Sequence, residues 1–211
     1  MNTPGSKWVW LCFAAAVLAG ICIFSYNGLD MAVAKQIQDL PKCWHEAAKT
    51  FSSWGKGELY AVPAGLAGAG LFWFWRRHRA RFWFSLFAIV AVAGSGLLNS
   101  GQKFLFGRAR PPRVWPSDAS YDYGFHLFHG TTAAWQSFPS GHNISAAAAA
   151  TVLWFVLPRW ARPACVIYVA SMMAARMLAN AHFFSDVLAG AFLGVVFTLA
   201  LRDLMRRRKL F

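Results

Sequence analysis

Three short polar stretches of this 211-residue chain carry residue types that suit the binding of a phosphate group. The first runs from Lys103 to Pro111, where Lys103 offers a compact charge and Arg110 a forked set of donors for phosphate oxygens. By itself this stretch is equally typical of a membrane span that ends on snorkelling basic side chains. Its meaning therefore depends on the other two stretches.

The second stretch, Pro139-Ser140-Gly141-His142, directly precedes an apolar run. Ser140 could cap the helix that starts there, and Gly141 could be a hinge. Alternatively, Ser140 and Gly141 open the helix with free backbone N–H groups and the positive end of its dipole, which together bind anions. His142 would then stand beside the bound anion.

The third stretch contains Arg176, His182 and Asp186. If residues 182 to 186 are helical, the last two side chains share one face, and Asp186 can accept a hydrogen bond from one imidazole nitrogen. The other nitrogen of His182 is then free, neutral and nucleophilic. Two histidines and one aspartate also suit zinc, but three cations beside them argue against a dication. We predict no metal and no cofactor.

The chain must position these stretches within a membrane. Its residues are 57% hydrophobic and only 14% charged, against roughly 25% charged in ordinary soluble domains. Apolar stretches of about the length of a bilayer core occur six times. The fold class predicted is therefore all-α, an integral membrane bundle of six transmembrane helices. The spans are residues 8–26, 59–75, 82–98, 143–157, 164–178 and 187–201.

The loops divide by charge. One set, which includes both ends of the chain, holds 12 Lys and Arg residues and one acid, whereas the other set holds nine and seven. The positive-inside rule places the first set, with the N- and C-termini, in the cytoplasm. All three polar stretches then lie on the outer side. The net charge of +13 follows from this topology, so we expect no nucleic acid partner.

The predicted domain organisation is one membrane domain over residues 1–211. Its core is about 58–201, and residues 27–57 form an outer loop with an interfacial helix. The apolar start could be read as a secretory signal, but it is long for one and no cleavage site follows, so we expect it to be the first span.

Together, Lys103-x6-Arg110-Pro111, Pro139-Ser140-Gly141-His142 and Arg176-x5-His182-x3-Asp186 resemble the three-part signature of the type 2 phosphatidic acid phosphatase superfamily. The resemblance implies that Lys103, Arg110 and Arg176 bind phosphate, with Ser140 and Gly141 as further donors. It also implies that His182 attacks phosphorus, that Asp186 orients His182, and that His142 protonates the leaving oxygen.

This sequence departs from the family pattern at two places. Ala175 stands where the family usually has serine, which removes one hydroxyl donor. Around the nucleophile the family commonly reads Gly-x-His-x-Pro, whereas this chain has Asn180 and Phe184 at the outer positions. The shape of this loop is therefore the open question, although every group that the chemistry needs is present.

We therefore predict a metal-independent lipid phosphatase or diphosphatase of a bacterial inner membrane, with its site facing the periplasm or the extracellular side. Its substrate is expected to be a membrane lipid phosphate of the undecaprenyl diphosphate, phosphatidylglycerol phosphate, phosphatidate or lipid A type. A phosphotransferase with the same site and a six-span transporter are the alternatives. Four further residues are either solvated loop groups or a second phosphate or sugar site: Arg108, Arg113, His126 and His129. The oligomeric state stays open.

Overall fold

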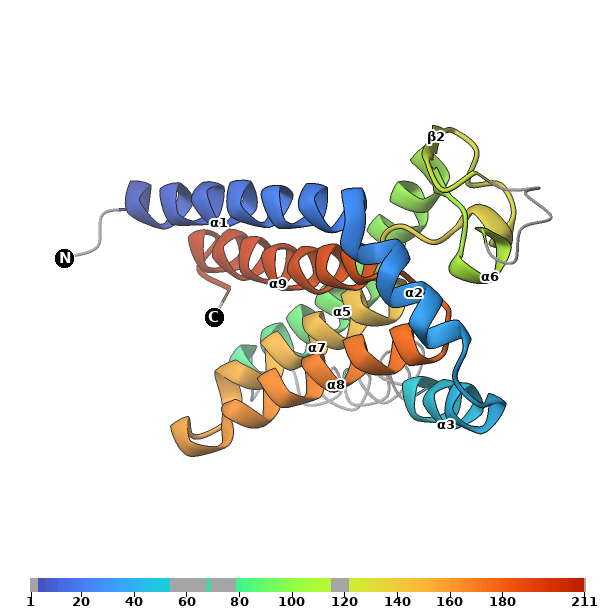
Figure 1. Ribbon diagram of the computed structural model, residues 1–211. Coiled ribbons are helices and arrows are strands. Elements are labelled where there is room, and N and C mark those ends of the chain that lie inside the picture. Colours follow the sequence, from blue (N-terminus) through green and yellow to red (C-terminus); the bar gives the residue numbers. More distant parts are fainter. Residues whose placement is uncertain (1–3, 54–67, 69–78, 115–121, 211) are drawn as a thin grey trace.

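The computed structural model describes residues 4–53, 68, 79–114 and 122–210, and these are mostly helical (Figure 1). The longer helices are α1 (Pro4–Phe24), α2 (Asp30–Gln38), α3 (Lys42–Ser52), α5 (Arg79–Leu105), α7 (Gly141–Val156), α8 (Pro163–Leu178) and α9 (Phe184–Arg207). The short elements are the π-helical turn η1 (Ser25–Leu29), β1 (Phe106–Arg108), α6 (Pro111–Val114), β2 (Phe125–Leu127) and the 3₁₀ turns η3 (Ala133–Trp135) and η4 (Arg159–Ala161).

Three described helical segments are long and apolar enough to cross a bilayer, namely 15–38, 82–105 and 184–207. They correspond to the first, third and sixth predicted spans. The fourth and fifth predicted spans are the helices α7 and α8, which have 16 residues each. The second, 59–75, lies outside the described residues except for Gly68. The six-span count and the orientation therefore stay predictions.

The first apolar stretch continues further than its composition indicates. Instead of ending near residue 26, α1 passes through η1 directly into α2, so that helical backbone extends to Gln38. In Figure 1, α1 lies alongside α9, and the start of α1 and the end of α9 are at the same end of the bundle. The elements α3, α6 and β2 lie at the other end. Asp30, at the junction of η1 and α2, is thereby carried to that second end.

Close packing of α7 against α9 depends on two glycines. A Cβ on Gly190 would lie 2.6 Å from the carbonyl oxygen of Ser140, and one on Gly194 would lie 2.3 Å from that of Ile144. Both distances are far shorter than a van der Waals contact, so a side chain at either position would force the helices apart. Small residues permit this close approach in membrane helices. The pair places the start of α9 directly beside the start of α7.

The all-α prediction needs one correction, because the described chain contains a small antiparallel sheet. Strand β1 follows α5 directly and pairs with β2, with Gly107 opposite His126. The loop after β2 folds back on the end of α5, where a Cβ on Gly130 would overlap the carbonyl group of Lys103. Pairing of the two extended segments satisfies backbone N–H and C=O groups that have no partner within a helix. The sheet holds the chain between Lys103 and Arg110 in a defined shape.

The predicted outer segment 27–57 contains α2 and α3. The helix α3 packs against α8 and buries Ala48 and Ser52, while Trp44 and Phe51 are exposed. His45 anchors it to the end of α8, where its Nδ1 lies 2.7 Å from the carbonyl oxygen of Leu178. Its placement at a membrane interface stays a prediction.

Candidate active site

Three basic side chains reach the site from three different elements. Lys103 lies in the last turn of α5. One turn earlier, Asn99 packs against the start of α7, since a Cβ on Gly141 would lie 2.6 Å from its amide nitrogen. Residues one turn apart share a helix face, so Lys103 also faces the start of α7. Arg110 follows β1, and its N–H donates to the carbonyl of Ala134.

Arg176 comes from the last turn of α8 and is held by α3. Its Nη1 donates to the hydroxyl of Ser52 at 3.0 Å. Arg110 and Arg176 both lie close enough to His182 for their charges to act on its imidazole, and Lys103 is within electrostatic range of both arginines. The structure thus brings together all three cations proposed from the sequence.

These cations have unused donors. The Nε atoms of Arg110 and Arg176 are buried without a hydrogen-bond partner. Within the described part of the chain, no carboxylate is within ion-pair distance of Lys103, Arg110 or Arg176. Buried charges without counterions are costly, and an anion that accepts several hydrogen bonds would offset that cost. The arrangement is suited to binding an anion.

His182 is buried beside these cations, but it is oriented differently from the sequence-based expectation. Its Nδ1 lies 2.8 Å from the carbonyl oxygen of Ser137 and 3.8 Å from the nearest carboxylate oxygen of Asp186. Because a carbonyl can only accept, Nδ1 carries the proton and Nε2 is the unprotonated nitrogen. Nδ1 is therefore directed at the Ser137 carbonyl, and Asp186 is a neighbour at ion-pair distance, farther away than the hydrogen bond predicted from the sequence.

The reason is the position at which the last helix starts. His182 precedes α9, which begins at Phe184, so the helical continuity assumed between residues 182 and 186 does not exist. Asp186 instead lies in the first turn of α9 and accepts the N–H of Phe183 at 3.0 Å and the hydroxyl of Ser137 at 2.6 Å. Asp186 acts on the imidazole directly through its charge, and it also contacts Ser137, whose carbonyl holds His182.

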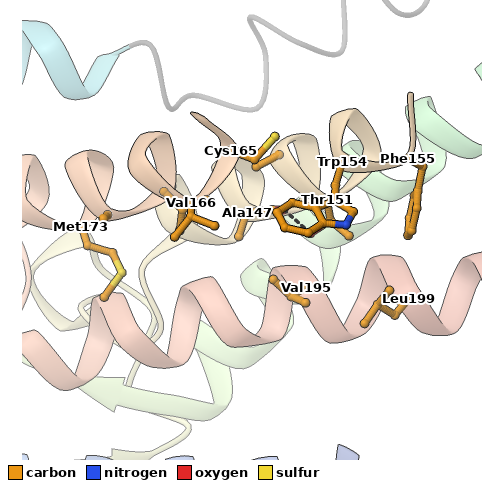
Figure 2. Close-up of a pocket in the computed structure, with 12 residues that line it drawn as sticks. Ala147, Thr151, Trp154, Phe155, Cys165, Val166, Met173, Val195 and Leu199 are labelled. Carbon is orange, nitrogen blue, oxygen red and sulfur yellow. Dashed lines mark hydrogen bonds between the residues drawn. The ribbon is translucent and has the colours of Figure 1, made fainter. Parts of the chain in front are cut away.

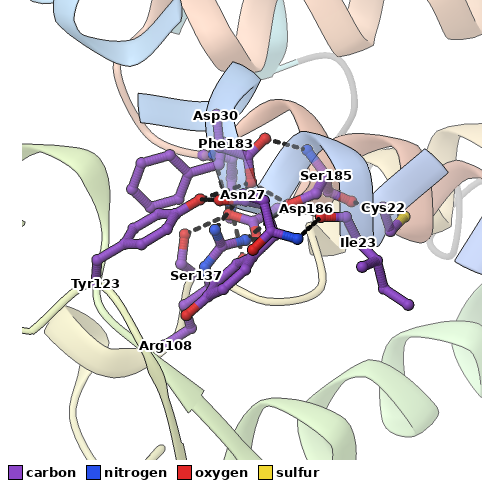
Figure 3. Close-up of polar contacts among 12 residues, drawn as sticks. Cys22, Ile23, Asn27, Asp30, Arg108, Tyr123, Ser137, Phe183, Ser185 and Asp186 are labelled. Atoms are coloured by element: carbon purple, nitrogen blue, oxygen red, sulfur yellow. Dashed lines mark hydrogen bonds and ion pairs between the residues drawn. The ribbon is translucent and has the colours of Figure 1, made fainter. Parts of the chain in front are cut away.

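Arg108 is the largest departure from the sequence analysis (Figure 3). Its side chain has no exposed surface and forms ion pairs with Asp186 and, at 2.9 Å, with Asp30. It is neither a solvated loop residue nor a free phosphate ligand. Burial disfavours its charge, but Asp186 and Asp30 outweigh that effect and raise the pKa of Arg108. The guanidinium also lies over several aromatic rings: Tyr26, Tyr123, Phe125 and Phe183.

Three further members of this polar cluster are not among the residues predicted from the sequence. They are Asp30, Ser137 and Ser185, and all are buried. The only signal for Asp30 is a single acid in a mainly apolar helical stretch, which was counted as outer-loop charge. Hydroxyl residues such as Ser137 and Ser185 are too common in loops for type and spacing to mark them.

The start of α7 is built as expected in outline. Gly141 is its first residue, so the N–H groups of the first turn have no acceptor within the helix. Ser140, however, already donates its hydroxyl to Asn143 at 2.9 Å and its N–H to the carbonyl of Asp186 at 3.1 Å. Ser140 therefore fixes the turn before α7. To contact phosphate, its hydroxyl would have to give up the bond to Asn143. His142, the second residue of α7, is half-buried.

The two loop departures from the family pattern have structural explanations. Asn180 adopts a left-handed backbone with φ of 51°, a conformation in which asparagine is the usual substitute for glycine. Phe184 is the first residue of α9, a position that favours proline but tolerates other residues, because its N–H needs no helical acceptor. Ala175 is buried.

Burial sets the protonation of the candidate nucleophile. Desolvation, with added repulsion from Arg176 and Arg110, lowers the pKa of His182 to about 3, against the opposing effect of Asp186. The imidazole is therefore neutral across the physiological pH range. Burial likewise lowers the pKa of Arg110.

The rest of the described chain offers no second cluster of this kind. The described residues contain no group of three or more His, Cys, Asp or Glu side chains able to hold a metal ion. An apolar pocket between α7, α8 and α9 is lined by residues such as Ala147, Trp154, Val166 and Leu199 (Figure 2). Its lining has no acid, base or cation.

Comparison with known proteins agrees with this geometry. Residues 84–210 match the family model of the PAP2 superfamily. Lipid A 1-phosphatases of Rhizobium etli and Rhizobium johnstonii are 38% and 37% identical to this chain over 121 residues, which is 56% of this chain. That match covers 48% and 46% of those proteins, so the chain spans about half the length of the curated relatives it matches.

Two solved structures share the fold. A transmembrane PAP2-type phosphatidylglycerolphosphate phosphatase from Bacillus subtilis superposes with a TM-score of 0.64 at 21% identity, covering 98% of each chain. LpxE of Aquifex aeolicus gives 0.59 at 22% identity, covering 83% of this chain and 96% of its own. Since the family model extends over more than half of the residues, the chain belongs to the PAP2 superfamily.

Proposed function

We propose that this protein is an integral membrane phosphatase that removes phosphate from a lipid through a phosphohistidine intermediate. The observation that carries the proposal is the pairing of a buried neutral His182, whose Nε2 is unprotonated, with three cations that have no carboxylate partner in the described chain. Phosphoryl transfer needs alignment and stabilisation of charge on the equatorial oxygens, which such a cluster supplies.

In the proposed reaction, Lys103, Arg110 and Arg176 bind the phosphate oxygens together with the N–H groups at Gly141 and the start of α7. Nε2 of His182 forms a bond to phosphorus while the bond between phosphorus and the lipid oxygen breaks. His142 donates a proton to that oxygen as it leaves. Water then attacks the phosphohistidine and releases inorganic phosphate, which restores the imidazole.

A groove beside the site supports a lipid substrate. It lies between α1, α5 and α9, and Leu18, Ile23 and Leu193 contribute to its mainly apolar lining. Its polar members include Gln102 and Ser185, which directly neighbour Lys103 and Asp186 in the sequence. We place the acyl chains on this face, within a six-span bundle whose site faces the outer side of a bacterial inner membrane.

The test is a panel of purified lipid phosphates, incubated with detergent-solubilised protein in excess EDTA. The panel contains lipid A, phosphatidylglycerol phosphate, phosphatidate and undecaprenyl diphosphate. We expect phosphate release from at least one of them, because no step requires a metal. Loss of activity that only a divalent ion restores would contradict the metal-free mechanism. Labelled phosphate that appears on a second lipid instead of in solution would favour the phosphotransferase.

The dependence of kcat/KM on pH is a further prediction. Because burial lowers the pKa of His182 to about 3, the free protein keeps its nucleophile neutral down to about pH 5. We therefore expect a bell-shaped dependence whose acidic limb lies below pH 5. Its alkaline limb is expected to follow the deprotonation of His142, which must be protonated to donate. The measurement is kcat/KM from about pH 3 to 9 for wild type and His142→Gln. An alkaline limb that is identical in His142→Gln would contradict this assignment.

A further inference from the structure

Asp30 lies outside the part of the chain that matches the family model, yet it reaches the site. It stands at the junction of η1 and α2, and its carboxylate has no exposed surface. In Figure 3 the guanidinium of Arg108 points toward both Asp30 and Asp186; Nη2 pairs with Asp30 and Nη1 with Asp186, so the guanidinium is shared between two carboxylates. The N-terminal helical segment thus supplies one of the two counterions of Arg108.

Asp30 also binds the start of α9. Its Oδ1 accepts the N–H of Ser185 at 2.9 Å, and its Oδ2 accepts the hydroxyl of Ser185 and, at 3.2 Å, that of Tyr123. A carboxylate at the first turn of a helix satisfies an N–H that has no acceptor and interacts favourably with the helix dipole. This turn of α9 is the one that carries Asp186.

A continuous chain of contacts leads from Asp30 to the candidate nucleophile. Asp30 holds Arg108, Arg108 holds Oδ1 of Asp186, and Oδ2 of Asp186 accepts the hydroxyl of Ser137. The carbonyl of Ser137 then accepts Nδ1–H of His182. Every side chain in this chain of contacts is buried.

We propose that Asp30 is a positioning residue for the reaction at His182, an inference that rests on the proposed function. Its charge divides Arg108 between two carboxylates and so keeps Asp186 turned toward Ser137. Buried ion pairs contribute little net stability but can select one arrangement among several. Without the charge of Asp30, the guanidinium is pulled toward Asp186 alone, and Ser137 loses the contact that fixes its carbonyl against the imidazole.

The test compares Asp30→Asn with wild type in the full-length protein. We expect kcat to fall roughly 10- to 100-fold, as for other residues that orient a catalytic group. Inhibition by inorganic phosphate is expected to stay within about twofold, because Asp30 contacts none of Lys103, Arg110 and Arg176. Global unfolding would instead lower kcat and weaken inhibition by phosphate together. Asp203→Asn is the matched control, since it removes an exposed carboxylate paired with Arg207 on α9.

A second readout does not depend on activity. In ¹⁵N-histidine NMR spectra at pH 7, wild-type His182 is expected to be the neutral tautomer with its proton on Nδ1, and Asp30→Asn is expected to give a mixture of tautomers. An unchanged tautomer together with unchanged kcat would overturn the proposal. If wild type releases no phosphate from any lipid, the proposed function fails, and the tautomer still decides the role of Asp30.

Tyr123→Phe covers the case in which Asp30→Asn does not fold. This variant removes a hydroxyl that lies 3.2 Å from Asp30 and 2.9 Å from the carbonyl oxygen of Tyr26, and it keeps every charge. We expect a two- to fivefold fall in kcat with unchanged inhibition by phosphate. If Asp30→Asn is unfolded and Tyr123→Phe matches wild type in kcat and in the His182 tautomer, Asp30 has only a structural role.

Discussion

His182→Ala is expected to reduce phosphate release roughly 10⁴-fold or more, because removal of a nucleophile leaves only the catalysis that binding and charge stabilisation provide. The three cations are not changed, so the variant is expected to keep its affinity for inorganic phosphate. The measurement is phosphate release by purified protein, with trapping of the labelled phosphoenzyme in an acid quench. Only wild type is expected to carry label.

The matched control is His129→Ala, which removes an exposed imidazole from the outer loop that packs on Trp135. This variant is expected to keep activity within about threefold. If His182→Ala still releases phosphate at the wild-type rate, His182 is not the nucleophile and the mechanism has to be abandoned. If His182→Ala is inactive but wild type forms no phosphoenzyme, a directly attacking water replaces the covalent step.

Arg108→Met is expected to be the most destabilising single change at the site. It leaves the carboxylates of Asp30 and Asp186 buried without their shared counterion, and removal of one partner of a buried ion pair costs roughly 3 to 5 kcal/mol. The free energy of unfolding in detergent, from denaturant titration, measures the effect. Activity is expected to fall as well, because Asp186 loses a contact.

Two companion variants make this result specific. Arg113→Met removes an arginine from the same outer region whose side chain is exposed, and such changes usually alter stability by about 0.5 kcal/mol or less. Arg108→Lys keeps the charge but lacks the planar fork that reaches both carboxylates, so an intermediate loss is expected. Equal stability of Arg108→Met and Arg113→Met would show that the buried ion pairs contribute nothing to folding.

Much of the site could be predicted from residue type and spacing. Lys103, Arg110 and Arg176 are cations at the ends of apolar stretches, and His182 follows one of them, so their convergence needed only helices that stop at the same end of the bundle. The glycines could be read too. Gly190 and Gly194 indicate close helix packing from sequence, because only small residues permit it.

The orientation of His182 differs from the one expected from spacing, and the difference has a simple physical origin. Spacing of four residues predicts a shared face only within a continuous helix, and whether residues 182 to 186 are helical depends on where the first turn of α9 finds acceptors for its N–H groups. Those acceptors are Asp30 and Asp186 themselves. With Asp186 capping the helix, the imidazole before it lies 2.8 Å from the Ser137 carbonyl and 3.8 Å from the carboxylate.

What the sequence by itself determined is the chemistry available to this protein: the types of its reactive groups, the apolar lengths that separate them and the basic loops that flank them. These are local properties, readable from neighbours along the chain. Only the tertiary structure decided that Arg108 is buried, that Asp30 is its counterion 78 residues away, and that a backbone carbonyl holds His182. A charge is buried or solvated according to what the rest of the fold packs around it, and that depends on distant segments whose meeting no local pattern records.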